Sequence, residues 1–490
     1  MTETLHERRL SAETHMNKQG VEDQIRARMR TRGIGRETID QFLSLVRRAR
    51  NTDSAYVALD SVSEPSTQYL YDGLSDIAQD KALRQRGEEL VSQATVIKLN
   101  GGRSTTMGGE VPKGVLIAKN GLSYLDIIAR QMLAFKRAWG VEIPLVLMNS
   151  FFTHEPTLEV ISRFDIPVVT FLQSQVPRLK ETTWEPLDTG TENDWTPPGH
   201  GDVYTSLRSS GLLDELLGKG RRWAFISNLD NLAGVLDPWI LGLMDYNEID
   251  FLLEVTDRTE VDRKGGTLVL RDGKLDLLEI AQVAPEERHA FMDIHRFRVF
   301  NTNNVWVDLK ALSEVIDWQM FNLPVIQNRK VVAGTEVVQL ETAMGAAVGA
   351  FGGARGLRVG RDRFFPTKKV EDLFLLQSDA CVLDSSFRLQ RNPERPTELP
   401  LRPDVVFEPD FLDSALRMDS RFEDPSSVSL VRAISLQVSG PVYFERDVKI
   451  EGRVVIKAPP GETHRIKQGT ALTEGAYPRV QDGVHSVVDS

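Results

Sequence analysis

The sequence predicts an α/β protein built on a mixed, mainly parallel sheet with helices on both faces, followed by a small C-terminal β-helix. Short apolar runs alternate with amphipathic segments between residues 95 and 228, which is typical of a mainly parallel sheet. Polar and glycine-rich turns follow the apolar runs, where ligands of such sheets gather. An apolar–x–Gly–x–Val unit at Val438–Val442 recurs twelve residues later at Ile450–Val454, which indicates short strands with glycine corners.

The length of the chain indicates two or three structural units. At 490 residues and 55.0 kDa it can form a large core and at least one smaller domain. We expect a flexible tail at 1–20, an N-terminal helical segment at 21–92, a main domain at 93–395, and a linker with a C-terminal β-helix domain at 396–490. The linker is expected because proline and charged residues are dense from 393 to 409.

Composition argues against several classes of protein. A net charge of −11 disfavours a nucleic-acid partner, because that affinity depends on Lys and Arg that neutralise phosphates. The single cysteine, Cys381, allows neither an intrachain disulfide nor a cysteine-based zinc site, which favours a cytoplasmic location. No apolar run is long enough to span a membrane and the N-terminus lacks an apolar segment, so we expect no membrane partner and no signal peptide.

The spacing of apolar residues places the individual elements. Two helices are expected between Val21 and Arg50, with a break near Gly33 and Gly35. The expected strands of the sheet are Val96–Leu99, Pro144–Met148, Val168–Leu172 and Trp223–Ser227. The expected helices between them are Leu122–Trp139, Thr157–Arg163 and Leu212–Leu217.

A glycine-rich loop follows the first of these strands. Gly101 and Gly102 lack a Cβ, so the backbone can lie against a ligand and point its N–H groups at it. Lys113 then supplies a cation, presented from a stiff loop by Pro112. Neither the GxxxxGK[ST] nor the GxGxxG pattern occurs in this loop. An ordinary strand-to-helix turn with a solvated lysine fits this stretch equally well.

Polar residues end two later strands. The carboxamide of Gln173 offers one acceptor and two donors, which match the imide edge of uracil, although a surface glutamine is the simpler interpretation. Asp230, with Asn228 before it, supplies the hard oxygen that Mg²⁺ prefers. A helix N-cap explains that aspartate equally well.

Four more segments carry candidate chemistry. Asp272-Gly273 predicts a hairpin that brings Gly266 close to Glu279, a carboxylate suited to sugar hydroxyls unless it is merely solvated. The others are the rigid turn Pro197–Asp202 with its histidine, the amide-rich Phe300–Asn304, and the basic cluster Arg361–Lys369. Each of the three also has a plain structural interpretation, as a turn or a solvated loop.

Six of these motifs occur in one order between about residues 94 and 375, and together they resemble the eukaryotic-type UTP–glucose-1-phosphate uridylyltransferase (UDP-glucose pyrophosphorylase) family. They are LNGG…PK, FLQ, PPGHGD, SNLDN, FNTNN and RxRFxPxK. The resemblance implies a Rossmann-like nucleotidyltransferase catalytic domain at 93–395 and a left-handed C-terminal β-helix. It also implies synthesis of UDP-glucose and pyrophosphate from UTP and glucose 1-phosphate with Mg²⁺, by in-line attack on the α-phosphorus of UTP.

The resemblance further implies a role for individual residues. Contacts to the nucleotide are expected from Leu99, Asn100, Gly101, Gly102, Lys113, Gln173, Gly199 and Asn228. Contacts to the sugar phosphate are expected from His200, Asp230, Gly266, Glu279, Asn301 and Asn303. Lys113 and Lys368 are expected to be catalytic, and Asp230 is expected to bind the metal.

The glycine loop departs from the family pattern at three positions. Arg103 and Ser104 stand where Leu-Gly is usual, and Val111 stands where Gly is usual. Two alternatives therefore stay open: the same reaction on N-acetylglucosamine 1-phosphate or galactose 1-phosphate, and a UDP-sugar-binding protein without catalysis. Self-association through the β-helix is a third open question.

Overall fold

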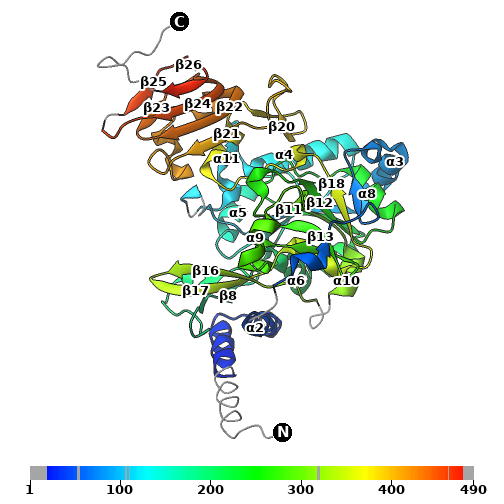
Figure 1. Ribbon diagram of the computed structural model, residues 1–490. Coiled ribbons are helices and arrows are strands. Elements are labelled where there is room, and N and C mark those ends of the chain that lie inside the picture. The colour runs from blue at the N-terminus through cyan, green and yellow to red at the C-terminus, as the bar shows by residue number, and fades with distance from the viewer. Residues whose placement is uncertain are drawn as a thin grey trace.

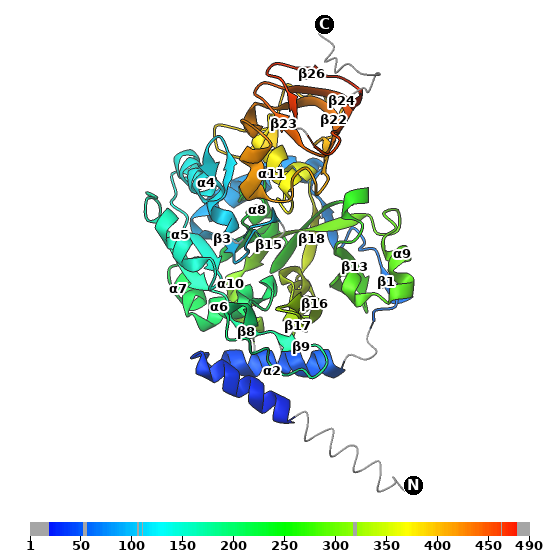
Figure 2. The same ribbon diagram turned by 90° about the vertical axis from the view of Figure 1, so that its left-hand side faces the viewer.

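The structure is a computed structural model that describes residues 19–51, 56–104, 107–109, 111–316, 321–461 and 463–477. The expected flexible tail lies outside the described residues except for residues 19 and 20, which begin a helix. The C-terminal strands and α2 lie at opposite ends of the molecule, with an α/β domain between them (Figures 1 and 2).

An eight-stranded sheet forms the middle of this domain. Its strands, in spatial order, are β2 (Leu70–Asp72), β18 (Arg355–Arg358), β12 (Phe251–Asp257), β15 (Val299–Asp308), β11 (Trp223–Asn228), β3 (Ala94–Asn100), β6 (Leu145–Asn149) and β7 (Val168–Leu172). Only β15 is antiparallel to its neighbours within this sheet. The mixed, mainly parallel sheet predicted from the sequence is confirmed.

The inner strands read as continuous apolar runs because both faces of the sheet are covered. Every residue of β3 and β6 is buried. Val96 belongs to the core on one face and Ile97 to the core on the other, and Leu145 and Val146 divide in the same way. Successive side chains thus feed two separate cores, as the two-residue period of a strand requires.

Helices cover both faces of the sheet (Figure 1). One core contains side chains of α3 (Lys81–Leu90), α4 (Tyr124–Trp139), α8 (Pro238–Tyr246) and α11 (Val370–Gln377). The other contains side chains of α6 (Val203–Ser209), α7 (Leu212–Gly218) and α10 (Leu309–Val315). The predicted helices are found as α4, α5 (His154–Ile161) and α7.

Local sequence fixes the ends of α4. Ser123 and Asp126 form a capping box at its N-terminus, in which each side chain bonds to the backbone N–H of the other residue. Gly140, with a φ of 67°, ends the helix in the left-handed conformation.

The N-terminal segment is helical only in part. Residues 19–31 and α2 (Arg36–Asn51) pack on Trp195, Val338 and Leu340. The same core contains residues of β8 (Val176–Pro177), β9 (Leu179–Lys180), β10 (Trp195–Thr196) and β17 (Thr335–Glu341). β17 in turn pairs with β16 (Ile326–Val332). The segment expected to be helical to residue 92 also contains β1 (Val62–Ser63) and β2, and β2 is an edge strand of the central sheet.

The predicted hairpin is present as β13 (Thr267–Arg271) and β14 (Lys274–Leu278). Asp272 and Gly273 both have positive φ angles, 51° and 73°, as the tight two-residue turn requires. The remaining short elements are α9 (Arg288–Phe291) and the pairs β4 (Ile117–Lys119) with β5 (Leu122–Ser123), and β19 (Cys381–Leu383) with β20 (Leu389–Arg391).

The C-terminal strands pair only in parallel within the described residues. One sheet holds β21 (Asp404–Phe407), β22 (Ser429–Ser439), β24 (Lys449–Lys457), β26 (Ala471–Leu472) and β27 (Gly475–Tyr477). A second holds β23 (Val442–Phe444) and β25 (His464–Ile466).

The twelve-residue repeat seen in the sequence is not the register of these strands. Val438 pairs with Ile456, and Ile450 pairs with Leu472. The chain passes through a strand of each sheet, β22 and then β23, before it returns to the first sheet as β24. Residues that face each other are therefore separated by more than one glycine corner.

The proline-rich segment expected to be a linker is anchored. Arg395 is buried and donates to the main-chain oxygens of Pro400, Leu430, Val431 and Ala433. β21 then adds the end of this segment to the C-terminal sheet by pairing with β22. A guanidinium that satisfies four carbonyl groups holds the connection against the domain that follows.

Aromatic rings join α11 to the C-terminal strands, which lie directly above it in Figure 1. Phe422 stacks between Phe374 of α11 and Phe444, at ring-centroid distances of 4.8 and 5.0 Å. Phe407 and Phe411 contact the same ring. Phe422 therefore lies at the centre of the packing between the two domains.

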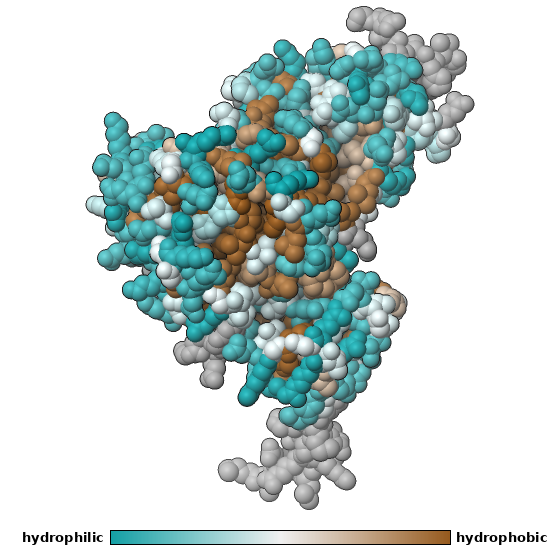
Figure 3. All heavy atoms as spheres, turned by 180° about the vertical axis from the view of Figure 1, so that it is seen from behind, coloured by the Kyte–Doolittle hydropathy of each residue, from teal (hydrophilic) through white to brown (hydrophobic). Residues whose placement is uncertain are grey.

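The surface of the molecule is mostly polar. On the face opposite to that of Figure 1, apolar side chains gather in the middle and hydrophilic ones surround them (Figure 3). Among the described residues, no helix has the length and hydropathy needed to cross a membrane.

We predict that Phe422→Ala will lower the free energy of unfolding by about 3–5 kcal/mol, because it leaves a cavity among stacked rings. Denaturant unfolding measures this change. Leu416→Ala is the matched control, since Leu416 lies nearby in the chain and is 53% exposed. Equal losses of stability in the two variants would contradict the central position given to Phe422.

Candidate active site

A cavity of about 510 Å³ opens at the carboxyl ends of β3, β6, β7 and β11. Ten residues predicted from the sequence line it: Leu99, Asn100, Gly101, Gly102, Lys113, Gln173, Gly199, His200, Asn228 and Asp230. They come from four loops that are distant in the sequence. The parallel strands bring these loops to one edge of the sheet, as the topology predicts.

The glycine loop folds back on itself. An antiparallel bridge joins Arg103 to Pro112, and the Lys113 N–H donates to the Gly102 carbonyl at 3.3 Å. The lysine therefore returns to the end of β3, close to the glycines that precede it. A Cβ on Gly101 would lie only 2.6 Å from Gln173 Oε1, so a larger residue here would displace the end of the Gln173 side chain.

Asn100 points into the protein rather than into the cavity. Its Nδ2 donates to Asn149 Oδ1 and to Thr157 Oγ1, both at 2.8 Å. The side chain thus fastens β3 to β6 and α5.

Gln173 spans the gap between the glycine loop and the Pro197–Asp202 turn. Its Nε2 donates to the Gly199 carbonyl at 2.6 Å, which turns Oε1 toward Gly101. Gly199 has a φ of 83°, and a Cβ there would lie 2.5 Å from the Thr342 carbonyl oxygen. The oriented carboxamide therefore presents an acceptor at the glycine turn.

Lys113 and Asp230 form an ion pair in the cavity wall. Lys113 Nζ lies 2.8 Å from Asp230 Oδ2 and donates to the Thr367 carbonyl at 2.9 Å. The other carboxylate oxygen, Oδ1, is buried and accepts no hydrogen bond from the described residues. This oxygen is suited to a hard cation, because a carboxylate oxygen is a preferred ligand of Mg²⁺.

His200 is held as a neutral imidazole. Its Nδ1 accepts the backbone N–H of Met344 at 3.0 Å, which leaves the proton on Nε2. Burial, together with the charge of Lys368, lowers the pKa of His200 to about 4. The ring is therefore a donor through Nε2 over the whole neutral range.

Glu279 and Gly266 lie together, as the hairpin predicts. A Cβ on Gly266 would lie 2.4 Å from Glu279 Oε1. Burial raises the pKa of Glu279 to about 7, and the charges of Lys368 and Arg258 oppose the rise. Lys368 acts on both His200 and Glu279, so it lies near both residues.

Asn301 and Asn303 stand next to this hairpin. The Asn301 N–H donates to the Gly266 carbonyl at 2.9 Å, and its Nδ2 donates to Asn303 Oδ1 at 3.0 Å. Asn303 has a φ of 56°, a strained value for a residue other than glycine. With Gly266, Glu279 and Lys368, these residues lie outside the lining of the larger cavity. A Cβ on Gly345 would lie 3.1 Å from Asn301 Nδ2, and Gly345 follows Met344, the residue bonded to His200.

Behind both groups lies a buried ion pair. Glu254 is fully buried and accepts from Arg363 Nη2 at 2.7 Å and Nε at 3.0 Å. Trp306 Nε1 and Asn304 Nδ2 donate to the same carboxylate. Every oxygen of this buried carboxylate is thus matched by donors, as burial of a charge demands.

Hydrogen bonds around this pair hold the two loops of the site together. Asn231 Nδ2 donates to the Arg363 carbonyl at 3.1 Å, and Asn231 Oδ1 accepts the Phe365 N–H at 2.9 Å. Lys98 Nζ donates to Ser227 Oγ at 2.7 Å and to the Gly234 carbonyl at 2.8 Å. The loop that carries Asp230 and the segment that carries Lys368 are therefore fixed against each other.

The cavity also has a wall that the sequence analysis did not predict. Arg178, Thr196, Lys330, Gln339 and Glu341 line it. Arg178 Nε donates to Gln339 Oε1 at 3.0 Å, and Gln339 Nε2 donates to Glu341 Oε1 at 3.2 Å. The two-residue spacing of Gln339 and Glu341 puts them on one face of β17, and that spacing is the only signal in the sequence that points to them.

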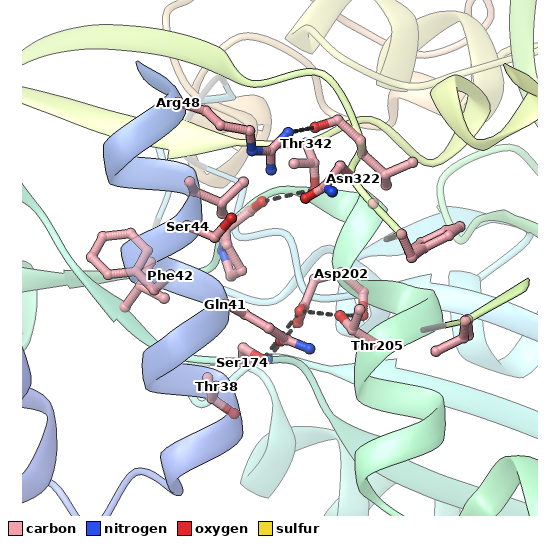
Figure 4. A pocket seen from close by; sticks show the side chains of 17 residues that line it. Thr38, Gln41, Phe42, Ser44, Arg48, Ser174, Asp202, Thr205, Asn322 and Thr342 are labelled. Carbon is pink, nitrogen blue, oxygen red and sulfur yellow. Dashed lines mark hydrogen bonds between the residues drawn. The ribbon is translucent and has the colours of Figure 1, made fainter. Parts of the chain in front are cut away.

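A smaller cavity of about 70 Å³ lies behind the Pro197–Asp202 turn, against α2 (Figure 4). Asp202 is buried there and accepts from Ser174 N, Ser206 Oγ and Thr205 Oγ1 at 2.6–2.8 Å. Ser174 follows Gln173, and Asp202 follows the His200 turn. The carboxylate therefore braces both ligand-facing loops from behind.

Comparison with known proteins gives a consistent result. A family model described as UTP–glucose-1-phosphate uridylyltransferase matches residues 39–451. A protein of that name from Solanum tuberosum is 39% identical over 439 residues, which cover 88% of this chain and 90% of the potato protein. A second from Dictyostelium discoideum is 39% identical over 394 residues, covering 79% of this chain and 77% of its own.

Solved structures agree with these sequence relatives. One is a mutant of UDP-glucose pyrophosphorylase from Leishmania major in complex with UDP-glucose, with a TM-score of 0.83 and 31% identity. The match covers 93% of this chain and 98% of the Leishmania chain. UDP-glucose phosphorylase from Trypanosoma brucei has a TM-score of 0.81 and 35% identity and covers 93% and 99%.

We predict that Arg363→Met will lower the free energy of unfolding by about 3–5 kcal/mol, because it leaves the Glu254 carboxylate buried without its counter-charge. The double variant Arg363→Met/Glu254→Gln should lose less than the sum of the single losses, since neither charge then stays unpaired. Denaturant unfolding measures each value, with the exposed Arg137→Met as the control. Additive losses would show that the two residues are not coupled.

Proposed function

The chain belongs to the UTP–glucose-1-phosphate uridylyltransferase family, and from this membership we propose how its cavity carries out the reaction. The protein is a nucleotidyltransferase that forms UDP-glucose and pyrophosphate from UTP and glucose 1-phosphate. Its substrates are therefore small molecules.

The cavity of about 510 Å³ is the site for UTP, and one observation carries this assignment. It joins the oriented carboxamide of Gln173 to the Lys113–Asp230 pair within a single space. The base lies against Gly101 and Gly102, where Gln173 Oε1 accepts the uracil N3–H. Gly199 and Asn228 complete the walls, and the triphosphate extends toward Lys113.

Glucose 1-phosphate binds beside His200. The Nε2 proton of the neutral imidazole is a fixed donor, and Glu279 with Asn301 and Asn303 supplies acceptors and donors for the sugar hydroxyls. Gly266 leaves room for Glu279 to approach. Lys368 lies near His200 and Glu279, and its charge attracts the phosphate of the sugar.

The reaction needs charge neutralisation and alignment more than acid–base catalysis. A phosphate oxygen of the sugar phosphate attacks the α-phosphorus of UTP, and pyrophosphate leaves from the opposite side. That oxygen is already anionic at neutral pH, so no general base is required. Lys113 and Lys368, from segments far apart in the chain, hold the two phosphate groups in line and offset their repulsion.

Asp230 is the residue that would hold Mg²⁺. Its buried Oδ1 accepts no hydrogen bond from the described residues. Mg²⁺ is commonly held by one or two carboxylates together with substrate phosphates, so the single carboxylate of Asp230 would suit it. When bound, the cation neutralises phosphate charge.

Several wider features are also part of the proposal. The parallel pairing of both C-terminal sheets supports a left-handed β-helix at 396–490, after a catalytic domain at 93–395. The lone buried Cys381 supports a cytoplasmic location. Self-association through the C-terminal strands is part of the same proposal, because an edge strand can pair with a second chain.

The assay that tests this function measures UDP-glucose and pyrophosphate formed from UTP, glucose 1-phosphate and Mg²⁺. We expect both products in equal amounts, and we expect chelation of the metal to stop their formation. Asp230→Asn should raise the Mg²⁺ concentration needed for half-maximal rate, whereas the turn variant Asp272→Asn should not.

Activity that survives chelation would contradict the role of the metal. Product from galactose 1-phosphate or N-acetylglucosamine 1-phosphate, but not from glucose 1-phosphate, would show that the substrate is a different sugar 1-phosphate. Binding of UDP-glucose without turnover would favour a protein that only binds the nucleotide sugar.

The raised pKa of Glu279 predicts a pH dependence. Only the carboxylate form accepts two sugar hydroxyls, and with a pKa of about 7 its fraction rises about tenfold between about pH 6 and about pH 8. The quantity to measure is the ratio of kcat/KM for glucose 1-phosphate in the wild type to that in Glu279→Gln. We expect this ratio to rise over the same pH range. This ratio cancels the ionisation of the substrates.

The exposed Glu260→Gln is the matched control, and its ratio should be independent of pH. A flat ratio for Glu279→Gln would show that Glu279 does not change its charge in contact with the sugar.

A further inference from the structure

Arg103 is the residue by which this chain departs most from the family pattern inside the cavity. It follows Gly102 directly and lines the nucleotide site. Its guanidinium carbon lies 3.9 Å from the centroid of the Phe152 ring, a close cation–π contact. The bridge between Arg103 and Pro112 fixes the main chain at the same point. Both the main chain and the guanidinium of Arg103 are thus held in place.

The arginine lies at the base end of the cavity. Phe152 follows β6 in the chain, as Gln173 follows β7, and both strands lie on the same side of β3. Asp230 follows β11, on the other side of β3. A Cβ on Gly101 would touch Gln173 Oε1 at 2.6 Å and approach Ser150 Cβ at 3.6 Å, so the glycine turn faces β6 and β7. Arg103 continues from that turn.

The charges nearby support this placement. Burial and the positive charge of Arg103 both lower the pKa of Arg178. Arg178 belongs to the wall with Gln339 and not to the Lys113–Asp230 pair. The charge of Arg103 is therefore felt at the wall that contains Arg178 and Gln339.

We propose that Arg103 is a specificity-determining residue that reads the base together with Gln173. This inference rests on the proposed binding of UTP in the cavity. A guanidinium only donates, and Gln173 Oε1 only accepts. Together they match a ring N–H beside a carbonyl oxygen, which is the imide edge of uracil.

Cytosine presents the reverse pattern at this edge. Its ring nitrogen N3 is an acceptor and its exocyclic group on C4 is an amino donor, whereas the carbonyl on C2 is common to both bases, so the guanidinium is assigned to the C4 side. With cytosine, the amino donor would face the guanidinium donor. The ring-nitrogen acceptor would face the acceptor Gln173 Oε1. Stacking on Phe152 limits the freedom of the guanidinium to turn away, because it holds the plane of the group.

The test compares kcat/KM for UTP and CTP with glucose 1-phosphate in the wild type and in Arg103→Leu. The variant restores the residue usual in the family. We expect its preference for UTP over CTP to fall at least about tenfold, mainly through the KM for UTP, as the loss of a fork-shaped contact to a base requires. The KM for glucose 1-phosphate should stay unchanged.

Two further variants separate shape from charge. Arg103→Lys keeps the charge but loses the planar fork, so it should lose most of the preference too. Phe152→Leu removes the ring that holds the guanidinium and should lose part of it by an independent route. The exposed Arg137→Leu on α4 is the control and should keep the wild-type preference.

Three outcomes would overturn the inference. Equal losses of kcat/KM for UTP and CTP would place Arg103 on the phosphates or the ribose, which the two nucleotides share. An unchanged preference in Arg103→Leu would remove it from recognition altogether. Full preference in Arg103→Lys would show that charge alone matters. A wild type inactive with UTP, in contrast, would refute the proposed function before this comparison begins.

Discussion

The arrangement of the site depends on the buried pair of Glu254 and Arg363. Glu254 is on β12, and Arg363 leads into the segment that ends at Lys368. A carboxylate with no exposure to water cannot be left unmatched, so its four donors must all be in place when the chain is folded. Through Asn231, the same network holds the loop of Asp230. The segment of Lys368 and the loop of Asp230, which pairs with Lys113, are therefore held against each other although they are distant in the chain.

An acidic protein can bind a polyanion because its charges are distributed unevenly. The net charge is −11, yet Arg103, Lys113 and Lys330 all line the cavity. Lys113 pairs with Asp230, so the charges of these two residues offset each other in the cavity wall. Local field, rather than total charge, decides which anions enter. The composition disfavours a long nucleic acid as a partner and says little about nucleotides.

Most of what local sequence controls could be predicted. The buried runs of β3 and β6, the Asp-Gly hairpin and the polar residues that end β7 and β11 follow from periodicity and turn chemistry. What could not be predicted depends on contacts between distant residues. Nothing near β2 indicates that it joins the edge of the main sheet, and the inward direction of the Asn100 side chain follows from partners on β6 and α5. The twelve-residue repeat also failed as a guide to register, because each turn of that domain contains strands of two sheets.

The one reversed strand of the sheet has a consequence for how such a protein can change. β15 runs against its neighbours, and Asn304 pairs with Ser227 near the end of β11. Asn301 and Asn303, near its start, therefore lie at the edge of the sheet where the neighbouring strands end. Pairing with β12 begins at Val299, directly after the connection from β14, and a shift of register between Asn301 and Asn304 leaves Asn303 out of the ladder. A change in the length of the connection from β14 to β15 can therefore alter the surroundings of Asn301 and Asn303 while the loops after β3, β6, β7 and β11 stay as they are. The residues proposed to contact the sugar and those proposed to contact the nucleotide are in this sense separate parts of one sheet.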